Sequence, residues 1–163
     1  MGKFVVMLTL RTQLAVGVDV IALGLAYWQR LRGTRAMPSR ADIDPVAICH
    51  LLPFVTLVDV LSDPLDFRCR LVGGEVERIT PFSPRGHRFS QSRSFRAGSD
   101  AWANYEHTVL SGRPLTAPLA YDSPDGAVHG LRHCLMPLSA DGCTVNMIFT
   151  MIAIDRHRVS PHT

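Results

Sequence analysis

The chain has 163 residues, of which 47% are hydrophobic and 19% are charged, and its formal net charge is +3. This length suits one domain with a hydrophobic core, and the composition is that of a globular protein rather than a disordered one. All but one of the 17 basic residues are arginines, and they are spread along the chain. Because nucleic-acid binding usually needs a concentrated basic surface, the composition predicts one folded unit without a nucleic-acid partner.

The four cysteines lie far apart and form no CxxC pair: Cys49, Cys69, Cys134 and Cys143. This spacing is not that of a disulfide-rich secreted domain, and lone cysteines are commonly buried. We therefore expect reduced, buried thiols in a cytoplasmic protein.

The N-terminal part contains two apolar stretches, Phe4 to Leu10 and Leu14 to Leu25, which Arg11 separates. A signal peptide needs one continuous apolar stretch, and a membrane span needs about 20 apolar residues. Asp19 lies inside the longer stretch. Neither a signal peptide nor a membrane span is therefore expected.

One face of this part carries apolar residues at spacings of 4, 3, 4 and 3: Leu14, Val18, Ile21, Leu25 and Trp28. Such a period predicts a helix with an apolar seam, which must be buried. We expect residues 1–32 to form an N-terminal helix whose seam pairs with a second subunit in a homodimer. The alternative is that the seam packs on the chain's own domain.

A basic linker follows from Leu31 to Asp44, with Arg35 and Arg40 near its centre. It is either an anion or partner site, or a set of surface ion pairs and helix caps. Asp44 and Pro45 favour the start of a small helix, as N-cap and first helical residue.

Two short apolar segments, Phe54 to Leu61 and Phe67 to Val72, predict a β-hairpin across a Ser-Asp-Pro turn. The period of two in a strand sorts the second segment into a core face and an opposite face. The core face holds Phe67, Cys69 and Leu71, and the opposite face holds Arg68, Arg70 and Val72.

Gly73 and Gly74 then allow a sharp turn into a short helix, Glu75 to Ile79, from which Val76 and Ile79 point inward.

The segment from Pro81 to Gly98 is irregular and basic, and two phenylalanines, Phe89 and Phe95, lie within it. Its basic residues are Arg85, His87, Arg88, Arg93 and Arg96. The segment is either a loop that holds an acidic ligand or partner, because guanidinium groups match carboxylates and phosphates, or a solvated connection.

The rest of the chain predicts a capped helix from Ala101 to Leu110 and three strands. The strands are Leu115 to Asp122, Val128 to Leu138 and Cys143 to Ile154, joined by Asp-Gly turns at 125–126 and 141–142. On the last strand, the alternation predicts one set of core-facing residues, Val145, Met147, Phe149 and Met151, and an outward set, Thr144, Asn146 and Thr150. Residues 155–163 should form a flexible tail.

Two segments carry a family resemblance. The first reads W-x2-LRG-x-R-x-MP-x-RADIDP from Trp28, followed by LLP, an apolar strand ending in Asp-Val, and RxRLVG. The second reads LxxxLMPLS-x-DG from Leu131 to Gly142. Together they resemble a bacterial family of PAS-type domains that are largely uncharacterised.

The resemblance implies an α+β PAS fold for residues 33–154. In that fold, a five-stranded antiparallel sheet carries helices on one face and follows the N-terminal helix. The family's implied use is sensing or protein contact.

Catalytic and metal-binding patterns are absent from the sequence. His129 and His133 are four apart on a predicted strand, about 13 Å from each other, which is too far to share one ion. His107 could serve only as a lone axial haem ligand. Neither a Gly-x-Ser-x-Gly turn nor a phosphate-binding loop occurs, and Cys69 and Cys134 have cationic neighbours only on the opposite strand face. We expect neither an enzyme nor a metal site, and the sequence names no cofactor.

The functional prediction is a stand-alone sensory module with a small-molecule pocket between the sheet and its helices. The predicted lining is Phe67, Cys69, Leu71, Val76, Ile79, Tyr105, Val109, His133, Met147 and Phe149. Such a module would act on a separate signalling protein. The alternative is a protein–protein interaction module in which the same residues fill the core.

Overall fold

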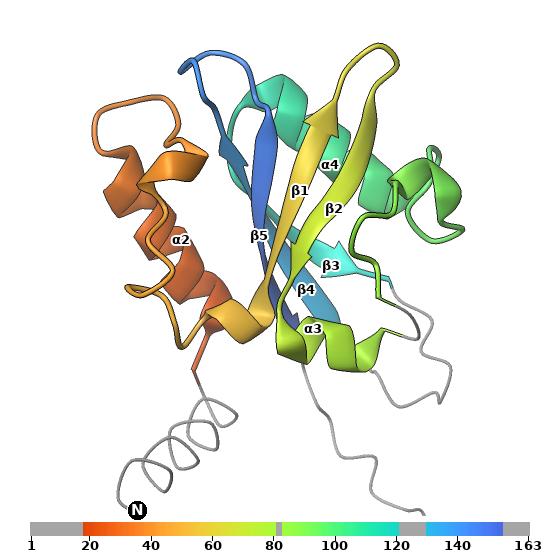
Figure 1. Cartoon of the computed structure of the whole chain (residues 1–163), viewed down its shortest axis with the longest axis horizontal. Helices are drawn as coiled ribbons and strands as arrows, with labels where there is room; N and C mark the ends of the chain where they lie inside the picture. Colours follow the sequence, from red (N-terminus) through yellow and green to blue (C-terminus); the bar gives the residue numbers. More distant parts are fainter. Residues whose placement is uncertain (1–17, 81–82, 121–129, 155–163) are drawn as a thin grey trace, which may run out of the picture.

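The computed structural model describes residues 18–80, 83–120 and 130–154. Within them lies one antiparallel sheet in the order β2-β1-β5-β4-β3 (Figure 1). Its strands are β1 (Val55–Leu61), β2 (Asp66–Val72), β3 (Leu115–Leu119), β4 (Leu131–Leu138) and β5 (Met147–Ile154). The predicted five-stranded antiparallel sheet is confirmed.

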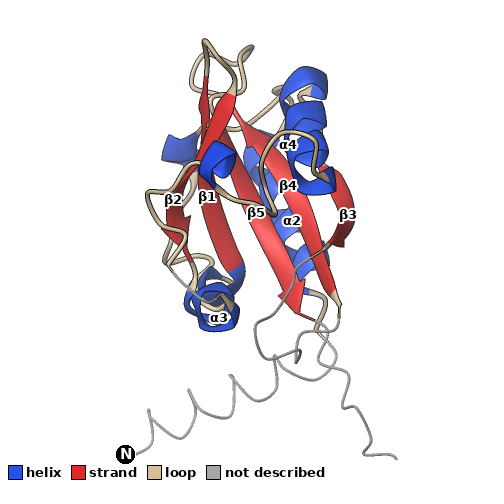
Figure 2. Cartoon of the chain, turned by 90° about the vertical axis from the view of Figure 1, so that its right-hand side faces the viewer, coloured by secondary structure: helices blue, strands red, loops and turns tan. Residues whose placement is uncertain are grey.

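Three α-helices pack around this sheet in the described residues: α2 (Val20–Arg32), α3 (Gly74–Ile79) and α4 (Asp100–Ser111). The two sides of β5 show how α2 and α4 are placed. The ring of Phe149 lies 6.5 Å from that of Tyr27 in α2, whereas the hydroxyl of Thr150 lies 3.1 Å from that of Tyr105 in α4. Consecutive strand residues point to opposite faces, so α2 and α4 cover opposite faces of the sheet (Figure 2). We call these the α2 face and the α4 face.

Helices cover both faces of the sheet, so the prediction that one set of residues on the last strand points outward is wrong for Thr150. Thr150 is fully buried, and so is Ile148, the preceding residue on the same face of the strand. A strand buried on both faces has no solvent side on which polar residues would be required, so alternation cannot identify its core face. Val145 is buried as predicted, but it precedes β5 in the hairpin connection.

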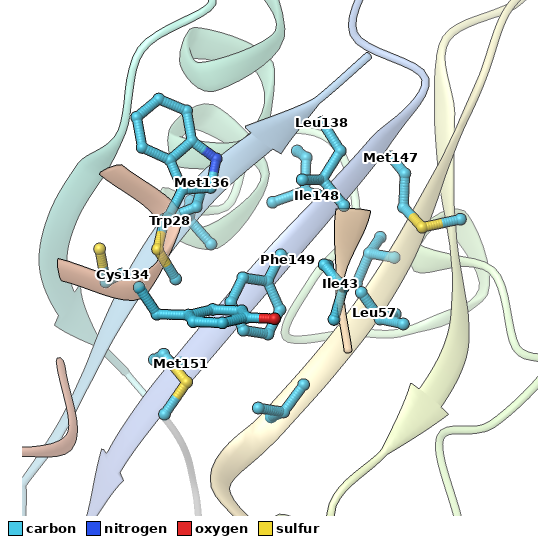
Figure 3. Close-up of a cluster of buried hydrophobic side chains, with 14 of the residues drawn as sticks. Trp28, Ile43, Leu57, Cys134, Met136, Leu138, Met147, Ile148, Phe149 and Met151 are labelled. Carbon is cyan, nitrogen blue, oxygen red and sulfur yellow. The ribbon is translucent and has the colours of Figure 1, made fainter. Parts of the chain in front are cut away.

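Asp19 caps the start of α2, because its carboxylate accepts hydrogen bonds from the amides of Ile21 and Ala22. Its inward side packs on a sulfur-rich cluster that includes Cys134, Met136 and Met151 (Figure 3). Trp28 donates from Nε1 to the carbonyl of Pro137 at 2.9 Å. The helix is therefore anchored to the chain's own sheet.

Among the described residues, the predicted N-terminal seam is partly buried and partly exposed. Ile21 and Trp28 are buried in the chain's own core, and Leu25 is half-buried against it, whereas Val18 is 41% exposed. Leu14 lies outside the described residues. The seam thus packs largely on its own domain, which is the alternative that the spacing left open.

The segment before β1 contains no α-helix at Asp44–Pro45, contrary to the prediction. Residues 45–51 form turns instead, and the Asp44 carboxylate accepts from the amide of Val46 at 2.9 Å. In the basic linker, Arg35 pairs with Asp42 at 3.0 Å, and Asp42 also accepts from the amide of Ser39. These contacts support the interpretation of the linker as a set of surface ion pairs and caps.

The predicted hairpin is present, but a bulge in β2 changes which face its residues occupy. Val58 pairs with Cys69 and Leu57 with Leu71, so Arg70 is the extra residue between them. Leu57 also pairs with Phe149 on the α2 face, which places Leu71 on that face too. The prediction that Leu71 shares a face with Phe67 and Cys69 is therefore wrong, because the extra residue reverses the alternation.

The remaining elements differ from their predicted bounds by a few residues. The Asp141–Gly142 connection is confirmed: the Asp141 carboxylate accepts from the amides of Cys143 and Thr144 at 2.8 and 2.7 Å. The turn at 125–126 and the tail at 155–163 lie outside the described residues. No helix in the described part of the chain is both long and apolar enough to cross a membrane.

Candidate functional site

The candidate site lies on the α4 face and is organised by α4 itself. Ser99 caps the helix by accepting from the amide of Trp102 at 3.1 Å, and Gly112 ends it in a left-handed conformation with φ of 63°. These two ends fix the helix so that Ala101, Tyr105 and Thr108 are buried. Their spacing of three and four residues places Tyr105 at the centre of the inward side.

Tyr105 joins the helix to the sheet through its hydroxyl. That hydroxyl lies 3.1 Å from Oγ1 of Thr150, which is fully buried on β5. Thr56 of β1 pairs with Thr150 across the sheet and also interacts with the Tyr105 hydroxyl. Burial raises the pKa of Tyr105 well above its ordinary value of 10, so the phenol stays neutral.

His133 of β4 extends this row of polar side chains. It is 1% exposed, and its Nε2 lies 3.2 Å from the side-chain nitrogen of Asn104 on α4. An amide nitrogen can only donate, so the imidazole is neutral and accepts at Nε2. Burial lowers the pKa of His133 to about 4, so it remains uncharged at neutral pH.

Aromatic rings enclose one side of this polar row. Phe67 of β2 has ring centroids of three neighbours within 5.4 Å, those of Phe89, Trp102 and Tyr105. Phe89 also packs on Tyr105 at 4.8 Å. The site therefore combines neutral hydrogen-bonding groups with flat apolar surfaces, and in the described residues it contains no charged group.

The two buried thiols are not prepared for nucleophilic attack. Burial is the main cause that raises the pKa of Cys69, to about 11, and it also raises that of Cys134. Cys69 lies on the α4 face and Cys134 on the α2 face. The prediction of buried thiols holds for both, but Cys49 and Cys143 are exposed, because each lies in a turn rather than a strand.

The structure divides the predicted pocket lining into three groups. Phe67, Tyr105 and His133 meet on the α4 face, Cys69 lies on the same face, and Val109 is half-buried against this core. Val76 and Ile79 belong to a separate cluster with Ala101, Leu119, Leu131 and Ile152. Met147 and Phe149 lie on the α2 face with Leu71, so these three cannot line a site under α4.

Sequence reasoning missed Thr56, Asn104 and Thr150, which supply most of the polar atoms of the site. Thr56 and Thr150 are polar residues within apolar strands, which could have marked them as site residues. The same pattern fits a threonine that points to solvent equally well. Asn104 could not be identified in this way, because its helix contains many other polar residues.

Two other histidines that the sequence raised as possible ligands are His107 and His129. His107 is exposed on the outer side of α4, and His129 lies outside the described residues. Among the described residues, no group of three or more His, Cys, Asp or Glu side chains is placed to hold an ion.

The strand order, the helices on both faces and the buried site under α4 define an α+β domain of the PAS type. The sequence profile described as PAS domain matches residues 21–152. The chain therefore belongs to the PAS domain family, and its general class is that of a sensory module.

A solved structure of a fungal LOV domain photoreceptor is similar at 16% identity and a TM-score of 0.46, and the match covers 72% of this chain and 95% of that chain. Similarity at this level carries no functional argument. No curated protein matches the sequence.

Proposed function

We propose that this PAS domain is a non-catalytic regulatory module that binds a small uncharged molecule under α4 and acts on a separate cytoplasmic signalling protein. The observation that carries the proposal is the row of buried, neutral hydrogen-bonding groups beside aromatic rings: Thr56, Tyr105, His133 and Thr150 with Phe67 and Phe89.

The character of the ligand follows from these groups. A buried charge without a counter-charge costs several kcal/mol, and the described site has no charged side chain, so a neutral ligand is favoured. Aromatic faces favour flat apolar groups, while hydroxyl and imidazole groups would orient a few polar atoms. The ligand would replace the contacts that Tyr105 and Thr150 now make with each other.

A regulatory effect also requires two states that the ligand binds unequally. Tyr105 connects α4 to β5, so exchanging its hydrogen bond for one to a ligand changes how α4 is held on the sheet. This connection provides a route from the site to the exposed side of α4.

A second function, that of an interaction module with a filled core, is favoured by one specific observation. Every buried side-chain nitrogen or oxygen in the described residues already has a hydrogen-bond partner. A core that satisfies its own polar groups and packs its rings closely gains nothing by admitting a ligand.

Mass spectrometry of freshly purified protein separates the two functions. Native and denaturing spectra are compared, and the absorption spectrum of the same sample is recorded. An extra mass that is lost on denaturation supports the ligand-binding proposal, and a visible band identifies a coloured ligand. A native mass without an addition, at several protein concentrations, supports the filled-core function.

A matched pair of Tyr→Phe variants tests the position of the ligand. Tyr105→Phe removes the hydroxyl under α4 but keeps the ring, and Tyr27→Phe does the same on the α2 face, where Tyr27 accepts from the amide of Asp44 at 2.9 Å. We expect Tyr105→Phe to weaken ligand binding about tenfold, the loss of one buried hydrogen bond, and therefore to lower the bound fraction, and Tyr27→Phe to leave it unchanged. Equal retention by both variants would place the ligand elsewhere.

A further inference from the structure

Four arginines gather at the outer edge of β2, although the sequence separates them into two pairs. Arg68 and Arg70 come from β2, and Arg85 and Arg88 come from the connection between α3 and α4. We call these four residues the β2 arginine surface. All four side chains reach solvent, and those of Arg68 and Arg70 are 43% and 57% exposed.

Backbone hydrogen bonds hold the two pairs together. The amide of Cys69 donates to the carbonyl of His87 at 3.1 Å, and the amide of Gly86 donates to the carbonyl of Cys69 at 2.6 Å. Arg68 and Arg88 face each other in an isolated antiparallel bridge, so their side chains are neighbours on one face. Figure 1 shows this green segment running beside β2.

Side chains anchor the same segment a second time. The carboxylate of Asp66 accepts from the hydroxyl and the amide of Ser90, at 2.6 and 3.2 Å. Phe89 is 8% exposed, and its ring lies 5.4 Å from that of Phe67. The arginines at 85 and 88 are therefore carried by a fastened segment rather than by a solvated loop.

A single carboxylate orients the two arginines of β2. Asp59, whose side chain is 8% exposed, accepts from Nε and Nη2 of Arg68 at 3.2 and 3.0 Å and from Nε of Arg70 at 2.8 Å. The remaining guanidinium N–H groups are left for other acceptors. Because the two side chains are already held in place, a partner carboxylate would bind them with a smaller loss of side-chain entropy.

The charges on this surface do not balance. Four arginines stand against two carboxylates, Asp59 and Asp66, and the oxygens of Asp66 already accept from Ser90 and Phe67. Among the described residues, no carboxylate lies within ion-pair distance of Arg85 or Arg88. Arg88 does lie close enough to Asp66 to help lower the pKa of that carboxyl. An excess of two positive charges remains.

We propose that the β2 arginine surface binds an acidic segment of the partner protein, with Asp or Glu side chains spaced along an extended chain. The arginines are spread along β2 and the segment beside it rather than around one point, and guanidinium forks match single carboxylates. A nucleic acid would need a longer basic track than these four arginines form. Between the arginines, the backbone of β2 is already paired at Cys69, so side chains would make these contacts.

This inference builds on the proposed function, because it names where the signalling partner binds, but it does not depend on a ligand under α4. The test uses a fluorescein-labelled octapeptide of alternating Glu and Ser, whose binding to the full chain is followed by anisotropy at low salt. The Arg70→Ala/Arg88→Ala variant is compared with Arg40→Ala/Arg113→Ala, which removes the same charge from exposed positions elsewhere.

We expect the first variant to bind the peptide at least about tenfold more weakly than the natural chain, because two charge-assisted pairs are lost, and the control to change by less than about twofold. An equal loss in both variants would show general charge attraction and overturn the proposal, as would no binding to the natural chain. Tighter binding of a single-stranded octanucleotide would overturn it in favour of nucleic acid. A chain that binds the peptide but purifies without ligand would contradict only the ligand-binding function.

Discussion

At the scale of single residues, His133 shows how burial converts a titratable group into a neutral hydrogen-bonding one. Its folded-state pKa of about 4 lies below the ordinary value of 6.5. Between these values the unfolded chain binds the proton more readily than the folded chain. The contribution of His133 to stability is therefore present above about pH 6.5 and is lost as the pH falls toward 4.

His133→Gln should remove this pH dependence while keeping an acceptor for Asn104. We expect the natural chain to lose about 1 to 2 kcal/mol of unfolding free energy from this group between pH 7 and pH 5, and the variant to lose correspondingly less. Urea unfolding at several pH values in that range measures the difference. Parallel curves for the two proteins would show that His133 titrates normally.

At the scale of elements, the junction between β2 and α3 depends on one of its two glycines. Gly73 has an ordinary φ of −71°, but a Cβ there would overlap the backbone carbonyls of Leu52 and Pro53. Gly74 begins α3, and a Cβ there meets nothing within 4 Å. Close approach of two backbones, rather than a special turn conformation, therefore requires the glycine at position 73.

We expect Gly73→Ala to destabilise the chain by at least about 2 kcal/mol, because backbone atoms cannot move aside as a flexible side chain would. The neighbouring Gly74→Ala should be neutral or stabilising by up to about 1 kcal/mol, since alanine restricts the unfolded chain and favours a helix. Thermal or urea unfolding of the two variants provides the comparison. Similar losses from both would mean that the junction needs glycine for conformation instead.

At the scale of the whole molecule, the predicted homodimer must use a different part of α2 from the one first expected. Ile21 and Trp28 are occupied within the chain's own core. The large apolar side chains that remain exposed on this helix and just before it are Val18 and Leu23, at 41% and 40%. A second subunit at α2 would have to cover these two residues.

Native mass measurements test this arrangement. We expect twice the chain mass for the natural protein and a single chain mass for Val18→Glu/Leu23→Glu, because two buried carboxylates would face apolar surface in the dimer. Leu110→Glu, at an exposed position on α4, is the control and should remain dimeric. A natural chain that is monomeric at micromolar concentration would contradict the predicted homodimer.

The sequence by itself determined the fold class and the order of its elements. Local signals were sufficient for this, since the Ser99 and Gly112 caps, the Asp141–Gly142 turn and the family motifs each act within a few residues. The hairpin of β1 and β2 and the short helix after Gly73 followed from the same signals to within one residue. The patterns also identified Tyr105, His133, Phe67 and Cys69, all of which meet on the α4 face.

Only the tertiary structure decided which face each residue occupies. The bulge at Arg70 moved Leu71 to the α2 face. On β5, the packing of α2 covered Met147 and Phe149, while the packing of α4 on the opposite face covered Thr150. Periodicity sorts the residues of one strand into two sets, but it cannot say which set is covered when both faces carry helices. Likewise, Arg68 and Arg88 became neighbours only when a distant segment paired with β2, because no local pattern encodes a contact between separate parts of the chain.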